Sequence, residues 1–215
     1  MAAKPRRPEA ADEAAALEAR GGALEPEAAI AFALDRFGPG EIAAVSSFGA
    51  DSAVLLHMIA RIDPSLPVVF LDTGKHFGET LDYRDRLAAD LGLTDIRIVT
   101  PDEAALQEAD PNGDLHKTDT DACCAVRKVD PFEQALGQYT AWMSGLRRAD
   151  SPERADAPIV TRDSRGLISI RPLATWDDAT TDAYIADNDV VLNPLLFDGY
   201  PSIGCAPCTQ RVAPG

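Results

Sequence analysis

The sequence predicts an α/β fold with a doubly wound, mostly parallel sheet. From residue 26 onward, short apolar runs alternate with amphipathic stretches of helical length. This alternation is typical of βαβ units, whose helices cover both faces of a parallel sheet. The 215 residues suit one domain and are enough to bury a substantial core. We therefore expect a single domain over residues 25–215.

The first half of this domain is expected to follow a flexible tail over residues 1–24. The tail is rich in Ala, Glu, Arg and Pro and has few large apolar side chains, so it can bury little surface. An amphipathic stretch at 27–37 predicts a helix, and the apolar run at 42–45 predicts a strand followed by a helix at 52–61. A buried strand at 67–71, a helix at 79–91 and a strand at 95–99 continue the alternation.

The second half repeats the pattern with wider gaps. We expect a helix at 125–136, strands at 139–144 and 167–170, and a helix at 177–187. Pro and Gly are frequent after Asn193, which predicts a loop. The sequence shows no internal repeat.

The charge balance narrows the class of ligand. The net charge of −15 argues against binding of nucleic acid or an anionic membrane by general electrostatics. No leader and no long apolar run is visible, and four cysteines are too few for a secreted disulfide scaffold, so we expect a cytoplasmic protein. Residues 127–171 nevertheless hold eight Lys/Arg against six Asp/Glu. This basic segment favours an anionic small molecule, with solvated surface arginines as the alternative.

Two consecutive strand ends carry residues suited to such a ligand. The loop at 45–52 joins a strand to a helix through small and hydroxyl residues, which can present backbone N–H groups and a helix dipole to an anion. In open parallel sheets, ligands bind beyond the carboxyl ends of the strands. A tight turn and a helix cap are the alternatives for the two loops. The candidate binding residues are Ser46, Ser47, Phe48, Gly49, Asp51 and Ser52 in the first loop, and Leu71, Asp72, Thr73 and Gly74 in the second.

A third strand end adds Gly145, Arg147 and Arg148, which follow the expected strand at 139–144. An arginine can hold a phosphate group through two parallel hydrogen bonds. Arg147 is our first candidate for the contact with a nucleotide, and Arg148 is the second. A surface salt bridge is the alternative for either.

All four cysteines fit one metal-cluster site: Cys123, Cys124, Cys205 and Cys208. Neighbouring side chains diverge on a helix, so an adjacent Cys-Cys pair can serve one site only if that site is larger than a single atom. This favours a [4Fe–4S] cluster over a mononuclear zinc ion or free structural cysteines. Lys128 lies four residues after Cys124, on the same face of a continuing helix, where its charge would favour a bound anion. Arg127 points elsewhere and is expected to be structural.

Several of these segments together resemble the adenylyl-sulfate reductases. The matching segments are SFGADS (47–52), LDTG (71–74), CCAVRK (123–128), WMSGLRR (142–148) and YPSIGCAPCT (200–209). The resemblance covers roughly residues 42–209. It implies the adenine-nucleotide alpha hydrolase-like fold of the ATP-pyrophosphatase (PP-loop) type and thioredoxin-dependent reduction of adenylyl sulfate to sulfite and AMP, in sulfate assimilation and cysteine biosynthesis. It also implies that all four cysteines ligate the cluster and that Lys128 links cluster and sulfate. The pair Asp51-Ser52 departs from the Glu-Asp pair of many cluster-bearing members.

The resemblance also implies a thiol that the sequence lacks. In the family, a cysteine near the C-terminus attacks the sulfate sulfur and forms a cysteine S-sulfonate. The Glu-Cys-Gly tail that carries this cysteine is absent here, as are the arginines that normally follow the Cys-x-x-Cys segment and hold the sulfate. We expect a shortened chain that binds nucleotide and cluster without completing the reduction. The alternatives are a tail supplied separately and a non-catalytic iron–sulfur protein that binds nucleotide. As other enzymes, phosphoadenylyl-sulfate reductase and an ATP-pyrophosphatase-type thiolation enzyme stay open.

Overall fold

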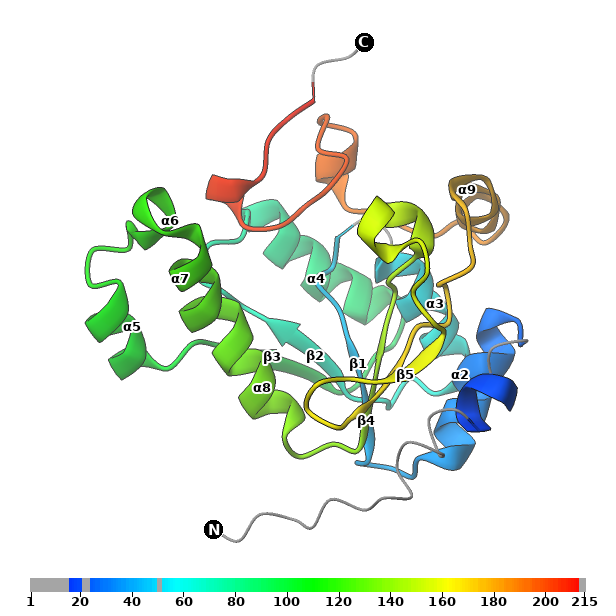
Figure 1. The fold of residues 1–215 in the computed structure, drawn as a ribbon. Helices are drawn as coiled ribbons and strands as arrows, with labels where there is room; N and C mark the ends of the chain where they lie inside the picture. The colour runs from blue at the N-terminus through cyan, green and yellow to red at the C-terminus, as the bar shows by residue number, and fades with distance from the viewer. Residues whose placement is uncertain (1–15, 21–23, 50–51, 213–215) are drawn as a thin grey trace, which may run out of the picture.

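The computed structural model describes residues 16–20, 24–49 and 52–212 of the chain (Figure 1). Its centre is a six-stranded sheet with the order β3-β2-β1-β4-β6-β5. The strands are β1 (Ile42–Val45), β2 (Val68–Leu71), β3 (Ile96–Val99), β4 (Ala141–Ser144), β5 (Val160–Arg162) and β6 (Ile168–Ile170). All neighbours are parallel except β5 and β6. The predicted doubly wound, mostly parallel sheet is therefore confirmed.

Strand β1 lies at the centre, paired with β2 on one side and with β4 on the other. Ala44 is opposite Val68 in β2 and opposite Met143 in β4. The apolar sequence of β1 follows from its central position, because a central parallel strand is covered on both faces. The chain leaves β1 in opposite directions along the sheet to reach β2 and β4, so the carboxyl ends of β1 and β4 form the switch point where such folds bind ligands.

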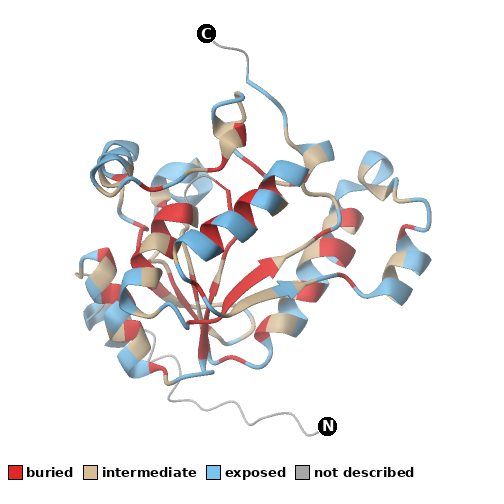
Figure 2. Cartoon of the chain, turned by 180° about the vertical axis from the view of Figure 1, so that it is seen from behind, coloured by how far each residue is buried: buried red, intermediate tan, exposed pale blue. Residues whose placement is uncertain are grey.

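Helices cover both faces of the sheet (Figures 1 and 2). The larger core lies on the face of Ala44 and includes buried residues of α2 (Pro26–Arg36), α3 (Ser52–Ile62) and α4 (Gly78–Asp90). The smaller core lies on the face of Ala43 and includes Leu136 of α8 (Asp130–Leu136). The last α-helix, α9 (Asp178–Asp187), lies against α3. None of the described helices combines the length and the apolar character needed to cross a bilayer.

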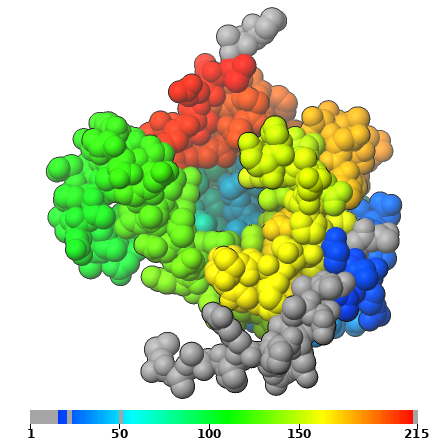
Figure 3. Space-filling model, in the orientation of Figure 1, coloured from blue at the N-terminus to red at the C-terminus, as the bar shows by residue number. Residues whose placement is uncertain are grey.

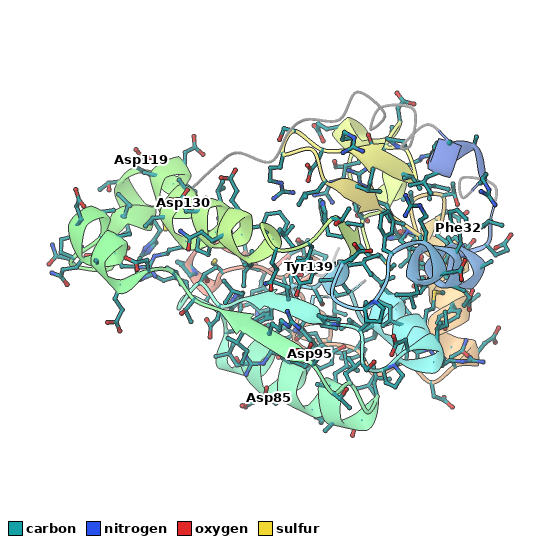
Figure 4. The ribbon with its side chains drawn as sticks, turned by 90° about the horizontal axis from the view of Figure 1, so that it is seen from below. Phe32, Asp85, Asp95, Asp119, Asp130 and Tyr139 are labelled. Carbon is teal, nitrogen blue, oxygen red and sulfur yellow. The ribbon has the colours of Figure 1, made fainter. Side chains whose placement is uncertain are left out.

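The segment that holds the adjacent cysteines differs from the single helix predicted at 125–136. It begins earlier, as α7 (Thr120–Cys124), winds through five residues of π-helix, η1 (Ala125–Val129), and ends as α8. Asp119 caps its start by accepting a hydrogen bond from Ala122 N at 2.9 Å, and Figure 4 shows Asp119 and Asp130 along this segment. Single π-turns within helices occur frequently at functional sites.

Among the described elements, two short α-helices and an edge strand had no sequence prediction. These are α5 (Glu103–Ala109), α6 (Leu115–Thr118) and the edge strand β5. Neither α5 nor α6 buries a side chain, so neither has the apolar periodicity that predicts a helix. Strand β5 is three residues long and is defined by its antiparallel partner β6. In its described part, the C-terminal region adds the short 3₁₀ turns η4 (Pro194–Leu196) and η5 (Ala206–Cys208), in line with the predicted loop.

Candidate nucleotide and thiol site

An open cavity of about 690 Å³ lies beyond the carboxyl ends of β1 and β4. In the space-filling view, a hollow opens between the yellow-green part of the chain, which includes lining residues 144–154, and the red part, which includes lining residues 201–203 (Figure 3). It is lined by Val45, Ser47, Gly49, Ser52, Ser144, Gly145, Leu146, Arg147, Ala149, Asp150, Ser151, Arg154, Asp178, Pro201, Ser202 and Ile203. The position is the one that the switch point of the sheet predicts for a ligand.

The loop after β1 forms the floor of this cavity through Ser47, Gly49 and Ser52. The Ser47 and Ser52 hydroxyls lie 3.4 Å apart, and Ser52 begins α3. A helix N-terminus with adjacent hydroxyl groups attracts an anion, because its first N–H groups have no partner within the helix. At Gly49 an added Cβ would lie 3.4 Å from the Ile203 carbonyl, so this position allows the C-terminal segment to approach closely. The geometry suits a phosphate group.

Two predicted residues of the same loop face away from the cavity. The Phe48 ring is fully buried and packs edge-on against Phe70, with ring centres 5.6 Å apart, while its backbone adopts φ 52°. Ser46 is buried and accepts a hydrogen bond from Phe48 N at 3.0 Å. Both residues shape the loop and do not line the cavity. Asp51 lies outside the described residues.

The wall above β4 contains Gly145 and Arg147, two of the residues expected from the sequence to contact a nucleotide. Arg147 is only 6% exposed, and its Nη1 donates to Asp178 Oδ1 at 2.9 Å and to Thr181 Oγ1 at 3.2 Å. Its Nε lies 3.3 Å from Asp150 Oδ1. Arg148 does not line the cavity, since its Nε donates to the Ala157 carbonyl at 2.8 Å. The guanidinium of Arg147 is thus at the cavity but already held by carboxylates.

The residues after β2 lie on the side of the cysteines, outside the cavity lining. Asp72 Oδ1 accepts a hydrogen bond from Gly74 N at 2.9 Å in a tight turn, and Gly74 has φ 68°. Thr73 is buried, and its hydroxyl lies 3.3 Å from Cys205 Sγ. The Leu71 carbonyl lies 2.9 Å from His76 Nε2. The two predicted loops therefore serve two adjacent regions, one with the cavity and one with the thiols.

All four cysteines are free; Cys123 and Cys205 are buried, Cys124 is half-buried and Cys208 is exposed. Burial raises the pKa of Cys123, the charge of Arg127 opposes this, and Asp110, Cys124 and Cys205 add to it. Arg127, four residues after Cys123, donates to the Thr73 carbonyl, and the Thr73 hydroxyl lies 3.3 Å from Cys205 Sγ, so both cysteine segments adjoin Thr73. Cys205 is held there by an antiparallel bridge to His76.

The four thiols are the donors that the predicted [4Fe–4S] cluster would need. Within the described ranges, no three His, Cys, Asp or Glu side chains converge closely enough to hold one ion. A [4Fe–4S] cluster is held by four thiolates, and the four free cysteines supply that number. Lys128, four residues after Cys124 in η1, is half-buried and forms no hydrogen bond or ion pair with any described residue.

A buried ion pair supports this region. Arg127 Nη2 lies 2.7 Å from Asp110 Oδ2, with the two side chains 9% and 2% exposed, and Arg127 Nη1 donates to the Thr73 carbonyl at 2.8 Å. Burial acts to raise the pKa of Asp110, but hydrogen bonds from Arg127 and from Leu115 N outweigh it and lower the pKa. The structural role predicted for Arg127 agrees with these contacts. Asp110 was not predicted, because an acidic residue in a loop carries no distinguishing signal.

Sequence reasoning also missed much of the cavity wall. Ser144 could have been found, since it ends a predicted strand at the switch point. Asp150, Ser151 and Arg154 lie in the loop just after Arg147, and Asp178 lies at the start of α9; their sequences give no sign that they meet at the cavity. Residues 201–203 belong to the segment that resembles the reductases, but their place beside the β1 loop is a tertiary result.

The sequence is similar to those of known proteins. Residues 41–211 match the phosphoadenosine phosphosulfate reductase domain. A protein from Chelativorans sp. (strain BNC1) named adenosine 5'-phosphosulfate reductase is 52% identical, and the match covers 100% of this chain and 88% of that protein. A protein of the same name from Mesorhizobium japonicum is 51% identical over 95% of this chain and 80% of its own length.

Solved structures agree as well. The phosphoadenylyl-sulfate reductase of Candida auris, in a phosphate complex, superposes with a TM-score of 0.80 at 27% identity and covers 97% of this chain and 100% of its own. The FMN adenylyltransferase of Candida glabrata shares only the fold, with a TM-score of 0.61 at 17% identity over 92% of this chain and 71% of its own. The chain therefore belongs to the phosphoadenosine phosphosulfate reductase domain family.

Proposed function

We propose that this chain binds adenylyl sulfate for reduction to sulfite and AMP, in the sulfate assimilation that leads to cysteine. The observation that carries the proposal is the cavity at the switch point, with the Ser47–Ser52 hydroxyls on its floor and the free thiols beside it. The names of the relatives at 52% and 51% identity support the same substrate. Free thiols suit the reducing cytoplasm.

Each part of the site has a role in this proposal. The N-terminus of α3, with Ser47, Gly49 and Ser52, holds the 5'-phosphate of the nucleotide. The open wall at Gly145 and Ser144 accepts the nucleoside. Lys128 has no partner among the described residues, so its ammonium is available to the sulfate group at the side of the cysteines.

The four cysteines would hold a [4Fe–4S] cluster, which when bound supplies an electrostatic centre beside the sulfate. Cys123 and Cys124 come from α7, and Cys205 and Cys208 come from the segment that also forms the cavity wall at 201–203. With these four thiols engaged, the attacking thiolate comes from outside the 215-residue sequence. It forms a bond to the sulfate sulfur, the bond from that sulfur to the phosphate oxygen breaks, and AMP leaves with the electron pair.

The resulting cysteine S-sulfonate needs a reductant with two thiols, which we assign to thioredoxin. One thiolate attacks the cysteine sulfur and releases sulfite, and the second closes a disulfide on the reductant. This transfers two electrons and regenerates the attacking cysteine as a thiol. Its chemistry is the ordinary exchange between thiolates and sulfenyl sulfur.

The experiment is a titration of the anaerobically prepared chain with adenylyl sulfate, alongside iron and sulfide analysis. We expect one nucleotide site and four iron atoms per chain, and the Cys205→Ser variant should lose iron. Absence of nucleotide binding would refute the proposal. A thioredoxin-coupled sulfite assay gives a second test: sulfite formation by the 215 residues alone would refute the external thiol.

Phosphoadenylyl sulfate is the second candidate substrate. It is favoured by the likeness to the Candida auris phosphoadenylyl-sulfate reductase. Comparison of turnover of the two nucleotides, with the attacking thiol supplied, decides between them.

A further inference from the structure

The charged side chains at the cavity form a closed set of opposite charges. Among the described lining residues there are two arginines, Arg147 and Arg154, and two aspartates, Asp150 and Asp178. The other lining residues are neutral. The charged lining therefore sums to zero, although the ligand proposed above is an anion.

Contacts within this set commit both arginines to carboxylates. Arg147 is bound by Asp178 at 2.9 Å and by Asp150 at 3.3 Å, and it is almost fully buried. Asp150 also accepts a hydrogen bond from Arg147 N at 2.9 Å and one from Arg154 Nη1 at 3.2 Å. Asp178 is 79% exposed, so its carboxylate lies at the rim and is available to a ligand or to solvent.

The charged lining neither attracts nor repels a nucleotide that has one anionic end. It disfavours the binding of a nucleotide that carries a second phosphate. A phosphate monoester brings about two negative charges near neutral pH. On the floor, the α3 N-terminus and the serine hydroxyls can hold one phosphate group. Near the wall, a second phosphate would meet two carboxylates and arginines that are already paired, and it would lose hydration without gaining an unpaired cation.

We propose that Asp150 and Asp178 are specificity-determining residues that exclude nucleotides with a further phosphate on the nucleoside. They do so by neutralising Arg147 and by opposing the extra charge directly. This assignment rests on the proposed function, since it takes the cavity as the nucleotide site. It names the residues that make the site select a nucleoside 5'-phosphosulfate over its 3'-phosphorylated form.

The test compares the binding of AMP and adenosine 3',5'-bisphosphate by calorimetry, with the wild-type chain and the Asp178→Asn variant. The wild type should bind AMP at least tenfold more tightly than the bisphosphate. In Asp178→Asn, the affinity for the bisphosphate should rise about fivefold relative to the affinity for AMP, the effect of one charge at contact distance in a wet site. This gain should shrink as KCl is raised, since salt screens exposed charges.

The control variant is Asp187→Asn, which removes the same charge from the other end of α9, away from the cavity. It should leave both affinities unchanged. Asp150→Asn is a second variant, with circular dichroism to confirm its fold, and it should also narrow the preference for AMP.

The outcomes separate the two proposals. If AMP binds and the wild type accepts both nucleotides equally, the specificity assignment is wrong while the proposed function stands. An equal rise in Asp178→Asn and Asp187→Asn overturns the assignment in the same way, because it shows a general charge effect. If neither nucleotide binds the wild type, the proposed function fails and the assignment fails with it.

Discussion

Replacement of Arg127 by Ala should destabilise the chain more than any surface charge substitution. The change leaves the Asp110 carboxylate in the interior, 2% exposed, with Leu115 N as its remaining hydrogen-bond donor. It also removes the donor at 2.8 Å from the Thr73 carbonyl. Removal of one partner from a buried ion pair costs roughly 3–5 kcal/mol. Because domains of this kind are stable by about 5–15 kcal/mol in total, the variant should lose a large part of its stability.

The assay is urea unfolding followed by circular dichroism, in a double-mutant cycle. The pair Arg127→Met and Asp110→Leu removes both charges, and it should recover most of the loss, since an apolar pair carries no uncompensated charge. Recovery should be incomplete, because Leu115 N and the Thr73 carbonyl lose their partners. Lys117→Ala breaks an exposed ion pair in the same region and serves as the control, with no measurable change expected. A loss in Arg127→Ala as small as that of the control would refute the reasoning.

Three further predictions follow from single contacts. The pKa of Asp110 is lowered in the folded chain, so its contribution to stability is fully present above the unfolded pKa of about 4 and is lost as pH falls through the lower folded pKa. Urea midpoints between pH 7 and pH 3 measure this contribution. In Arg127→Met the urea midpoint should depend less steeply on pH. Phe48→Ala should cost roughly 3–5 kcal/mol, because the ring is fully buried against Phe70, and a urea midpoint within error of the wild type would contradict this. Lys128→Gln should weaken binding of adenylyl sulfate about tenfold and leave AMP binding unchanged, as measured by calorimetry; equal weakening of both would place Lys128 at the nucleotide and not at the sulfate.

The central elements could be predicted because their burial produces a regular local spacing of apolar residues. The run at 42–45 matches β1 residue for residue, and the helix expected at 52–61 differs from α3 by one residue. Each lies where one or both faces are covered, so apolar residues recur at the period of the element. Helices α5 and α6 bury no side chain, and β5 is a three-residue strand at the sheet edge. These elements therefore have no apolar periodicity from which they could be predicted.

The site was predictable at the level of loops and less so at the level of side chains. Strand order places the ends of β1 and β4 together, which is why Ser47, Gly49 and Gly145 line the cavity as expected. Whether a loop residue faces the ligand or the core depends on its backbone angles and its neighbours. Phe48 turned inward for this reason, and Arg148 turned toward the Ala157 carbonyl.

By itself, the sequence determined the fold class, the family and the set of four thiols, because these depend on residue type, spacing and the alternation of apolar runs. Only the tertiary structure decided that the loop after β1 serves the cavity while the loop after β2 serves the cysteines. Only it brought Asp150 and Asp178 onto the same arginine. The physical reason is that ion pairing and burial at a site join segments that lie far apart along the chain, and no local pattern encodes which partner a charge will meet.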